Sequence, residues 1–401
     1  MNKNIKSLII VLFVLIPILL FSKDKTYLEY WTPFTGGDAR PMQFIVDKFN
    51  SSQDEIVVNM KVIEWAKYYP LLLKSINTKK SPDVAIVHAS KLSEFISSNL
   101  LKELKDIKTE QFTKKTINSV RFNSKLYGVP IDTHLLLAYY NKEYIDKLEN
   151  KMSENEFIEF FKTLQTKLPK DVVALGQPID NVFPFWIWYT FYNQIDGGGK
   201  YIENNKAVFN NKAGLKALNF LVKLRDEGIY KKQINDTQGY NMFKYGKSSV
   251  FFTGGWANWN FEQNKDLDFG VAPFMQVFDK PATWSDSHTL SIPIGVDEKK
   301  YESILKFSNF VAFEGLIWSS AGHIPSNKTV LNSNEYKENT KRSKYSKYLE
   351  FSYSMPKHKN LWLCNEIMIR IFSDMMQSNK TAQETLNYAQ DEVDKVLKEN
   401  R

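Results

Sequence analysis

Three adjacent polar residues, Asp132, Thr133 and His134, interrupt an apolar segment (LYGVPIDTHLLLAYYNK, 126–142) that otherwise predicts a buried strand. Polar side chains inside a sheet are costly unless each finds a hydrogen-bond partner. Because side chains alternate along a strand, Asp132 and His134 share one side and Thr133 lies on the other. A carboxylate and an imidazole on one face can accept and donate hydrogen bonds to ligand hydroxyl groups. The same pair could instead be a structural contact without any ligand.

Tryptophan side chains offer a second type of ligand contact, which is stacking on a flat aromatic ring. TWSDSHTLSIP (283–293) places Trp284 and His288 on alternate positions of an extended segment, so both face the same way. Trp65 stands at the start of a predicted helix, EWAKYYPLLLKSIN, where its flat indole ring could form a stacking platform for a ligand. Tyr69, one helical turn later, falls on the apolar stripe and is assigned to the core.

Two glycine pairs and two further residues complete the set of candidate ligand-binding residues. Glycine lets a backbone approach a ligand closely, although TPFTGGDAR could also be a plain tight turn capped by its aspartate. The glycine segments contribute Thr35, Gly36 and Asp38 in TPFTGGDAR, and Gly254, Gly255 and Trp256 in FFTGGWANW. His88 ends a predicted strand, and Trp186 lies off the main apolar face of the predicted helix 183–192.

Catalytic and metal-binding motifs are not found in the sequence. The histidines have no HxxxH or Cys–His spacing, and they are His88, His134, His288, His323 and His358. No GxSxG elbow and no GxxxxGK[ST] phosphate loop occur. Cys364 is the only cysteine, so no intramolecular disulfide can form. A metal site assembled from distant segments stays open, but no spacing supports one. We therefore predict neither an enzyme nor a metal or other cofactor.

The elements that must position these residues alternate between strand and helix. Strands are predicted at 27–31, 55–63 and 81–88, and helices at 41–50, 64–77 and 90–101. This rhythm is typical of an α/β domain with a largely parallel sheet, in which ligands bind beyond the carboxyl ends of the strands. The first strand ends at the glycine turn, the second just before Trp65, and the third at His88.

Length and charge narrow the class of protein further. A chain of 401 residues with 43% apolar composition favours two domains over one. The net charge of +8 comes mostly from lysines interspersed with acids. The densest basic stretch, YKENTKRSKYSKY (336–348), is interpreted as a solvated surface, so no nucleic-acid partner is predicted.

The N-terminal segment predicts export. Lys3 and Lys6 precede an apolar run of 14 residues, 8–21, which is shorter than the roughly 20 residues that a membrane-spanning helix needs. We predict a signal peptide over 1–22 that is cleaved, with a retained anchor as the alternative. No cysteine stands directly after the run, so a lipoprotein anchor is not expected, and the predicted location is the periplasm.

Seven segments in order carry a family resemblance that covers essentially the whole chain after the apolar run. They are YWTPFTGGDARPMQFIVDKFN, EWAKYYPLLLKSI, KKSPDVAIVH, LYGVPIDTHLLLAYYNK, FFTGGWA, TWSDSHTLSIP and AGHIPSNK. Together they resemble the extracellular solute-binding proteins of carbohydrate ABC transporters, the maltose-binding-protein-like family. The resemblance implies an α/β, two-lobed periplasmic-binding-protein fold, with crossing strands at the hinge and a ligand cleft between the lobes.

The resemblance also implies an organisation and a function. The expected segments are an N-terminal lobe over 23–135, a C-terminal lobe over 136–284, a return to the first lobe over 285–330, and a helical tail on the second lobe over 331–401. The expected function is capture of a mono- or oligosaccharide by hinge closure and delivery of this sugar to membrane permease subunits. The protein is expected to act as a monomer. The alternatives are an exported glycoside hydrolase or lyase, against which the chain lacks the eight βα units of a barrel, and a surface adhesin.

Overall fold

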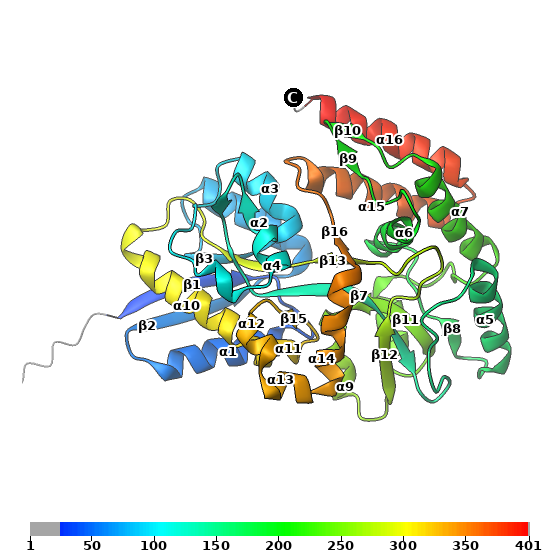
Figure 1. The fold of residues 1–401 in the computed structure, drawn as a ribbon, viewed down its shortest axis with the longest axis horizontal. Coiled ribbons are helices and arrows are strands. Elements are labelled where there is room, and N and C mark those ends of the chain that lie inside the picture. The colour runs from blue at the N-terminus through cyan, green and yellow to red at the C-terminus, as the bar shows by residue number, and fades with distance from the viewer. Residues whose placement is uncertain (1–24, 400–401) are drawn as a thin grey trace, which may run out of the picture.

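The computed structural model describes residues 25–399 and shows two α/β lobes, each with its own hydrophobic core (Figure 1). The strands of the first lobe are β1 (Thr26–Thr32), β2 (Ile56–Val62), β3 (Val84–His88), β6 (Val129–Pro130) and β14 (His288–Ser291). They form one sheet in the order β2-β1-β3-β14-β6. β1 is parallel to β2 and β3, whereas β14 is antiparallel to β3 and β6. A late segment of the chain, β14, therefore lies inside the first sheet, between β3 and β6.

Helices cover the first sheet, and the first three of them agree with the helices predicted at 41–50, 64–77 and 90–101. They are α1 (Ala39–Ser52), α2 (Trp65–Asn77), α3 (Ala89–Ser97), α4 (Lys114–Ser119), α10 (Tyr301–Phe313) and α11 (Gly315–Ser319). α1 buries Met42, Ile45, Val46 and Phe49, the spacing of one helical face. The predicted alternation of three strands and three helices in residues 26–97 is confirmed.

The second lobe is built on β7, which runs from the first lobe into the second in Figure 1. Its strands are β7 (Asp132–Asn141), β8 (Val173–Leu175), β11 (Ser248–Gly254), β12 (Phe269–Pro273), β13 (Thr283–Asp286), β15 (Ile324–Pro325) and β16 (Ser352–Ser354). The main path is β16-β13-β7-β11-β8, and β12 and β15 also pair with β7. β7 pairs antiparallel with four strands, which are β11, β12, β13 and β15. It is therefore the central strand of the second sheet.

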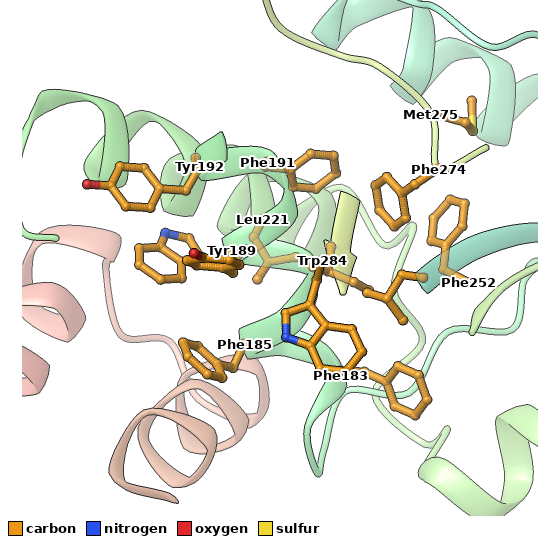
Figure 2. Close-up of a cluster of buried hydrophobic side chains, with 14 of the residues drawn as sticks. Phe183, Phe185, Tyr189, Phe191, Tyr192, Leu221, Phe252, Phe274, Met275 and Trp284 are labelled. Atoms are coloured by element: carbon orange, nitrogen blue, oxygen red, sulfur yellow. The ribbon is translucent and has the colours of Figure 1, made fainter. Parts of the chain in front are cut away.

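The second core is rich in aromatic side chains. Its helices are α5 (Glu154–Lys167), α6 (Phe183–Gln194), α7 (Lys212–Asp226), α8 (Asp236–Lys244), α9 (Asn258–Gln263), α15 (Leu361–Gln377) and α16 (Ala382–Glu399). α6 is apolar on all sides because it lies between the sheet and the helices α7 and α15. Figure 2 shows Trp284 of β13 among Phe183, Phe185 and Tyr189 of this helix.

Short elements complete the chain. They are the hairpins β4 (Arg121–Phe122) with β5 (Lys125–Leu126) and β9 (Ile202–Glu203) with β10 (Lys206–Ala207), and the helices α12 (Lys328–Asn332), α13 (Asn334–Glu338) and α14 (Thr340–Ser346). Within the basic stretch at α13 and α14, Arg342 is buried and pairs with Glu262 of α9. Among residues 25–399, no helix is both long and apolar enough to cross a bilayer. The predicted signal peptide lies outside the described residues.

Candidate functional site

The chain passes between the two cores three times, and all three passages meet at one junction. Each passage is flanked by one residue of the first core and one of the second. The residues of the first core are Ile131, Leu290 and Ala321, and their counterparts in the second core are Leu135, Trp284 and Ile324. The first passage enters β7, the second joins β13 to β14, and the third joins α11 to β15. β13 and β15 both pair with the start of β7, which brings the three passages side by side.

Asp132 lies at the centre of this junction and is fully buried. Its Oδ1 accepts from the backbone N–H of His288 at 3.0 Å, and its Oδ2 accepts from His288 Nδ1 at 2.7 Å and from Trp318 Nε1 at 2.6 Å. His134 Nδ1 stands 3.4 Å from Oδ1. Burial alone raises the pKa of Asp132, but His288, His323 and these hydrogen bonds outweigh it and hold the pKa well below its ordinary value. Asp132 is therefore a carboxylate that every passage contacts.

Asp132 and His134 lie on the same side of β7, as the alternation predicts, and Thr133 contacts Ser287 instead. The His134 ring packs 4.3 Å from the His288 ring and 5.6 Å from the His323 ring, between centroids. Burial lowers the pKa of His134 to about 3, and the neighbouring His288 adds to this effect. His134 is thus a neutral imidazole at neutral pH.

A tryptophan cluster of the second lobe adjoins His134. Trp284 stacks on Trp186 with ring centroids 3.9 Å apart and planes 16° apart. Trp256 meets Trp186 edge-on at 6.0 Å, and the His134 ring lies 5.7 Å from Trp256. Trp284 is 4% exposed, whereas Trp186 and Trp256 are half-buried. The structure brings the three predicted tryptophans of this lobe together with the predicted histidine.

The first lobe contributes Trp65 and His88 to the opposite side of the junction. Trp65 is 41% exposed, and its ring meets the His88 ring edge-on at 5.0 Å. Tyr69, assigned to the core by its spacing, is buried, and its hydroxyl contacts His88 Nδ1 at 2.7 Å. The His88 ring in turn lies 4.5 Å from the His288 ring. An unbroken series of rings therefore joins Trp65 to the centre of the junction.

The two glycine segments bring the lobes into direct contact. Thr35 and Gly36 are exposed, and a Cβ on Gly37 would lie 2.2 Å from the carbonyl oxygen of Trp256. A Cβ on Gly255 would lie 2.1 Å from the carbonyl oxygen of Gly322. These positions require glycine because backbone meets backbone. Gly254 ends β11 immediately before this contact.

Asp38 does not cap α1 through its side chain, although it precedes that helix. Its Oδ1 accepts from His323 Nε2 at 2.8 Å. Burial lowers the pKa of His323, but Asp38 and Asp132 outweigh it and raise the pKa above its ordinary value. The side-chain partner of Asp38 thus lies 285 positions away in the chain.

Sequence reasoning missed His323, Trp318 and Trp362 as members of the junction. Trp318 donates to Asp132, and Trp362 of α15 packs 6.3 Å from Trp65 between ring centroids. His323 lies in a segment that carried the family resemblance, AGHIPSNK, but without spacing that indicates chemistry. Trp362 begins a C-terminal helix and has no local signal at all.

A separate hollow of about 760 Å³ lies on the second lobe near the start of α5. Its lining includes Lys151, Glu154, Lys216 and Asp279. None of the predicted binding residues lines it, so it is distinct from the junction.

The family profile of bacterial extracellular solute-binding proteins matches residues 45–344. The chain belongs to this family. The maltodextrin-binding protein MdxE of Bacillus subtilis is 22% identical over 405 residues, which cover 95% of this chain and 90% of that protein. The galactooligosaccharide-binding protein of the same bacterium is 26% identical over 239 residues, 57% of this chain and 56% of that protein.

Solved structures of the same fold span nearly the whole chain of this solute-binding protein. The ABC substrate-binding protein Lmo0181 from Listeria monocytogenes, in complex with cycloalternan, superimposes with a TM-score of 0.80 at 18% identity, over 93% of this chain and 99% of that one. The maltose/maltodextrin-binding domain MalE from Bdellovibrio bacteriovorus, bound to maltotriose, gives 0.80 at 17% identity, over 93% and 100%. The predicted periplasmic-binding-protein fold is confirmed.

Proposed function

We propose that this solute-binding protein is the substrate-binding component of an ABC importer, and that it captures an oligosaccharide and delivers it to a membrane permease. The observation that carries the proposal is the convergence of aromatic and hydrogen-bonding side chains from both lobes at the junction, in a chain of this family. The names of the relatives, which refer to maltodextrin and galactooligosaccharide, support an oligosaccharide over a single sugar.

In this proposal the ligand stacks between tryptophans of the two lobes. Trp65 offers a half-exposed ring from the first lobe, and Trp186 and Trp256 offer partly exposed rings from the second. His88 and His134 supply hydrogen bonds that discriminate hydroxyl orientations, because a buried polar group left unpaired penalises the wrong sugar. The other proposed binding residues are Thr35, Gly36, Asp38, Asp132, Gly254, Gly255, Trp284 and His288.

Binding is proposed to favour the closed arrangement of the lobes. Several contacts form only when the lobes meet: Lys91 Nζ of α3 lies 4.3 Å from the ring centroid of Trp362, and Lys115 of α4 donates to the backbone oxygens of Leu349 and Ser352. A ligand that touches both lobes adds to these contacts only in the closed state, so it shifts the population toward closure. The permease would then recognise the two lobes in their closed arrangement.

The remaining features of the proposal concern organisation and location. We place the lobe boundaries at 23–135, 136–284 and 285–330, with a tail over 331–401. The protein is proposed to reach the periplasm through a cleaved signal peptide over 1–22 and to act there as a monomer. The permease subunits are its proposed partners.

The test is thermal unfolding and tryptophan fluorescence of the purified chain against maltooligosaccharides, galactooligosaccharides, single sugars and polyols. A ligand at 100 times its dissociation constant should add about 2.7 kcal/mol to the unfolding free energy. Small-angle scattering with and without the active sugar reports closure. Trp65→Ala should weaken binding at least about tenfold. The control is Tyr27→Ala, which should leave binding unchanged, because Tyr27 is exposed near the N-terminal end of β1, and the glycine segment follows the other end of that strand.

Two outcomes would contradict the proposal. No shift with any oligosaccharide would remove the sugar assignment while leaving the family intact. Release of smaller sugars during incubation would favour the glycoside hydrolase that the sequence left as an alternative.

A further inference from the structure

The three passages between the lobes each bring a metal-ligating side chain to the same point. Asp132 and His134 come from the first passage, His288 from the second and His323 from the third. One ligand atom from each of these four residues lies within 4.8 Å of the other three, and all four residues are buried. We call this set the junction cluster.

His323 has the arrangement of a metal-ligating imidazole. In the neutral ring whose Nε2 donates to Asp38 Oδ1 at 2.8 Å, Nδ1 carries the lone pair that a metal ion needs. That Nδ1 is buried, has no hydrogen-bond partner, and stands 3.9 Å from Asp132 Oδ2. A buried nitrogen without a partner is costly, and the pairing of the opposite ring nitrogen with a carboxylate is the outer-shell pattern of metal-bound histidines.

We propose that the junction cluster binds one Zn²⁺ ion, held by Asp132, His134, His288 and His323, with Asp38 positioning His323. Three imidazoles and one carboxylate match a closed, four-coordinate zinc site. Ligand atoms of such a site lie about 3.3 Å apart, so the cluster must contract by about 1 Å or less toward its centre. When His288 binds the ion through Nδ1, the proton on that nitrogen leaves to solvent and Nε2 takes a proton from solvent, so the ring stays a neutral ligand.

The alternative is a hydrogen-bonded network that joins the passages without any ion. In that case the hydrogen bonds that Trp318 and His288 donate offset the cost of burying the Asp132 carboxylate. That network leaves His323 Nδ1 without a partner at the centre of the cluster, which a metal would remedy. An ion at this point would tie together all three connections, so zinc would stiffen the hinge whatever ligand the cleft takes.

The experiment measures zinc on the purified full chain, prepared without a histidine tag. After treatment with a strong chelator, the protein is reloaded with Zn²⁺ and equilibrated against a weaker competing chelator, and zinc per chain is determined by mass spectrometry. The expected result is one zinc per chain and a higher melting temperature than that of the stripped protein. Cobalt substitution should give the visible absorption of a tetrahedral site.

Variants locate the ion. His323→Gln and His134→Gln should lose the tightly bound zinc and the cobalt spectrum. Asp38→Asn keeps every ligand and should weaken zinc binding about 10- to 100-fold, which provides a test even if a ligand variant folds poorly. His88→Gln is the matched control: it is buried against His288 but lies outside the cluster, and it should retain one zinc.

The proposal is overturned if the native chain holds no stoichiometric zinc at equilibrium with the competitor. It is also overturned if His323→Gln and His134→Gln bind zinc as the native chain does, which would place the ion elsewhere. Neither readout involves a sugar, so a failure of the zinc site can be told apart from a failure of sugar binding. A bound zinc would remove Asp132, His134 and His288 from the residues proposed to contact the sugar.

Discussion

Trp65 and Trp284 are both proposed to contact the ligand, but the structure gives them different effects on stability. Trp284 is 4% exposed and belongs to the second core (Figure 2). It stacks on Trp186 with ring centroids 3.9 Å apart. Trp65 is 41% exposed and touches its neighbours only through ring edges or tilted contacts. Replacing each by alanine therefore separates a ring that supports the fold from a ring presented on the surface of the first lobe.

The expected magnitudes follow from burial. Truncating a fully buried tryptophan to alanine costs about 3–5 kcal/mol, and the lost stacking on Trp186 places Trp284→Ala toward the upper end. Trp65→Ala leaves a site that water already reaches, so we expect a loss of about 1 kcal/mol or less. The two variants should thus differ by at least about 2 kcal/mol in unfolding free energy.

The assay is urea unfolding of both variants at neutral pH, followed by circular dichroism, together with sugar titrations at a temperature where both are folded. Trp65→Ala should lose affinity while its unfolding midpoint stays close to that of the native chain. Equal midpoints for the two variants would refute the assignment of Trp284 to the core. Native affinity in Trp65→Ala would refute its stacking role.

Three further predictions concern the junction and the contacts between lobes. Gly37→Ala should fold normally but bind sugar at least about tenfold more weakly in a calorimetric titration, because its Cβ would lie 2.2 Å from the carbonyl oxygen of Trp256 and hinder closure; unchanged affinity would argue against this closed contact. Asp132→Asn should lower the unfolding free energy by about 3–5 kcal/mol in urea, since it turns a fully paired carboxylate into an amide facing three donors, and a loss below about 1 kcal/mol would contradict that role. Burial lowers the pKa of Lys115 to about 8, below its unfolded value near 10.5, so the folded state holds fewer protons between these pH values and the unfolding free energy should rise across that window by up to about 3 kcal/mol. The unfolding free energy of Lys115→Met should rise less with pH than that of the native chain. Identical pH dependence in the two proteins would contradict the lowered pKa of Lys115.

The local structure of the first lobe follows from sequence patterns because those patterns report which way neighbouring side chains face. The spacing of Met42, Ile45, Val46 and Phe49 predicts the buried face of α1, and the structure has it. The alternation at 132–134 predicts that Asp132 and His134 share a side, and they do. The order of the seven motifs indicates the family, and the family profile confirms it.

The junction could not be predicted in the same way. His323 meets Asp38 across 285 positions, and Trp318 meets Asp132 across 186. These contacts exist because β14 inserts between β3 and β6 and because β13 and β15 both pair with the start of β7. Periodicity carries no information on which distant segments become neighbours in a sheet. The sequence by itself therefore determined the elements, the faces and the family, whereas only the tertiary structure decided that histidines from three separate segments surround one carboxylate, since strand order is set by the packing of the whole chain.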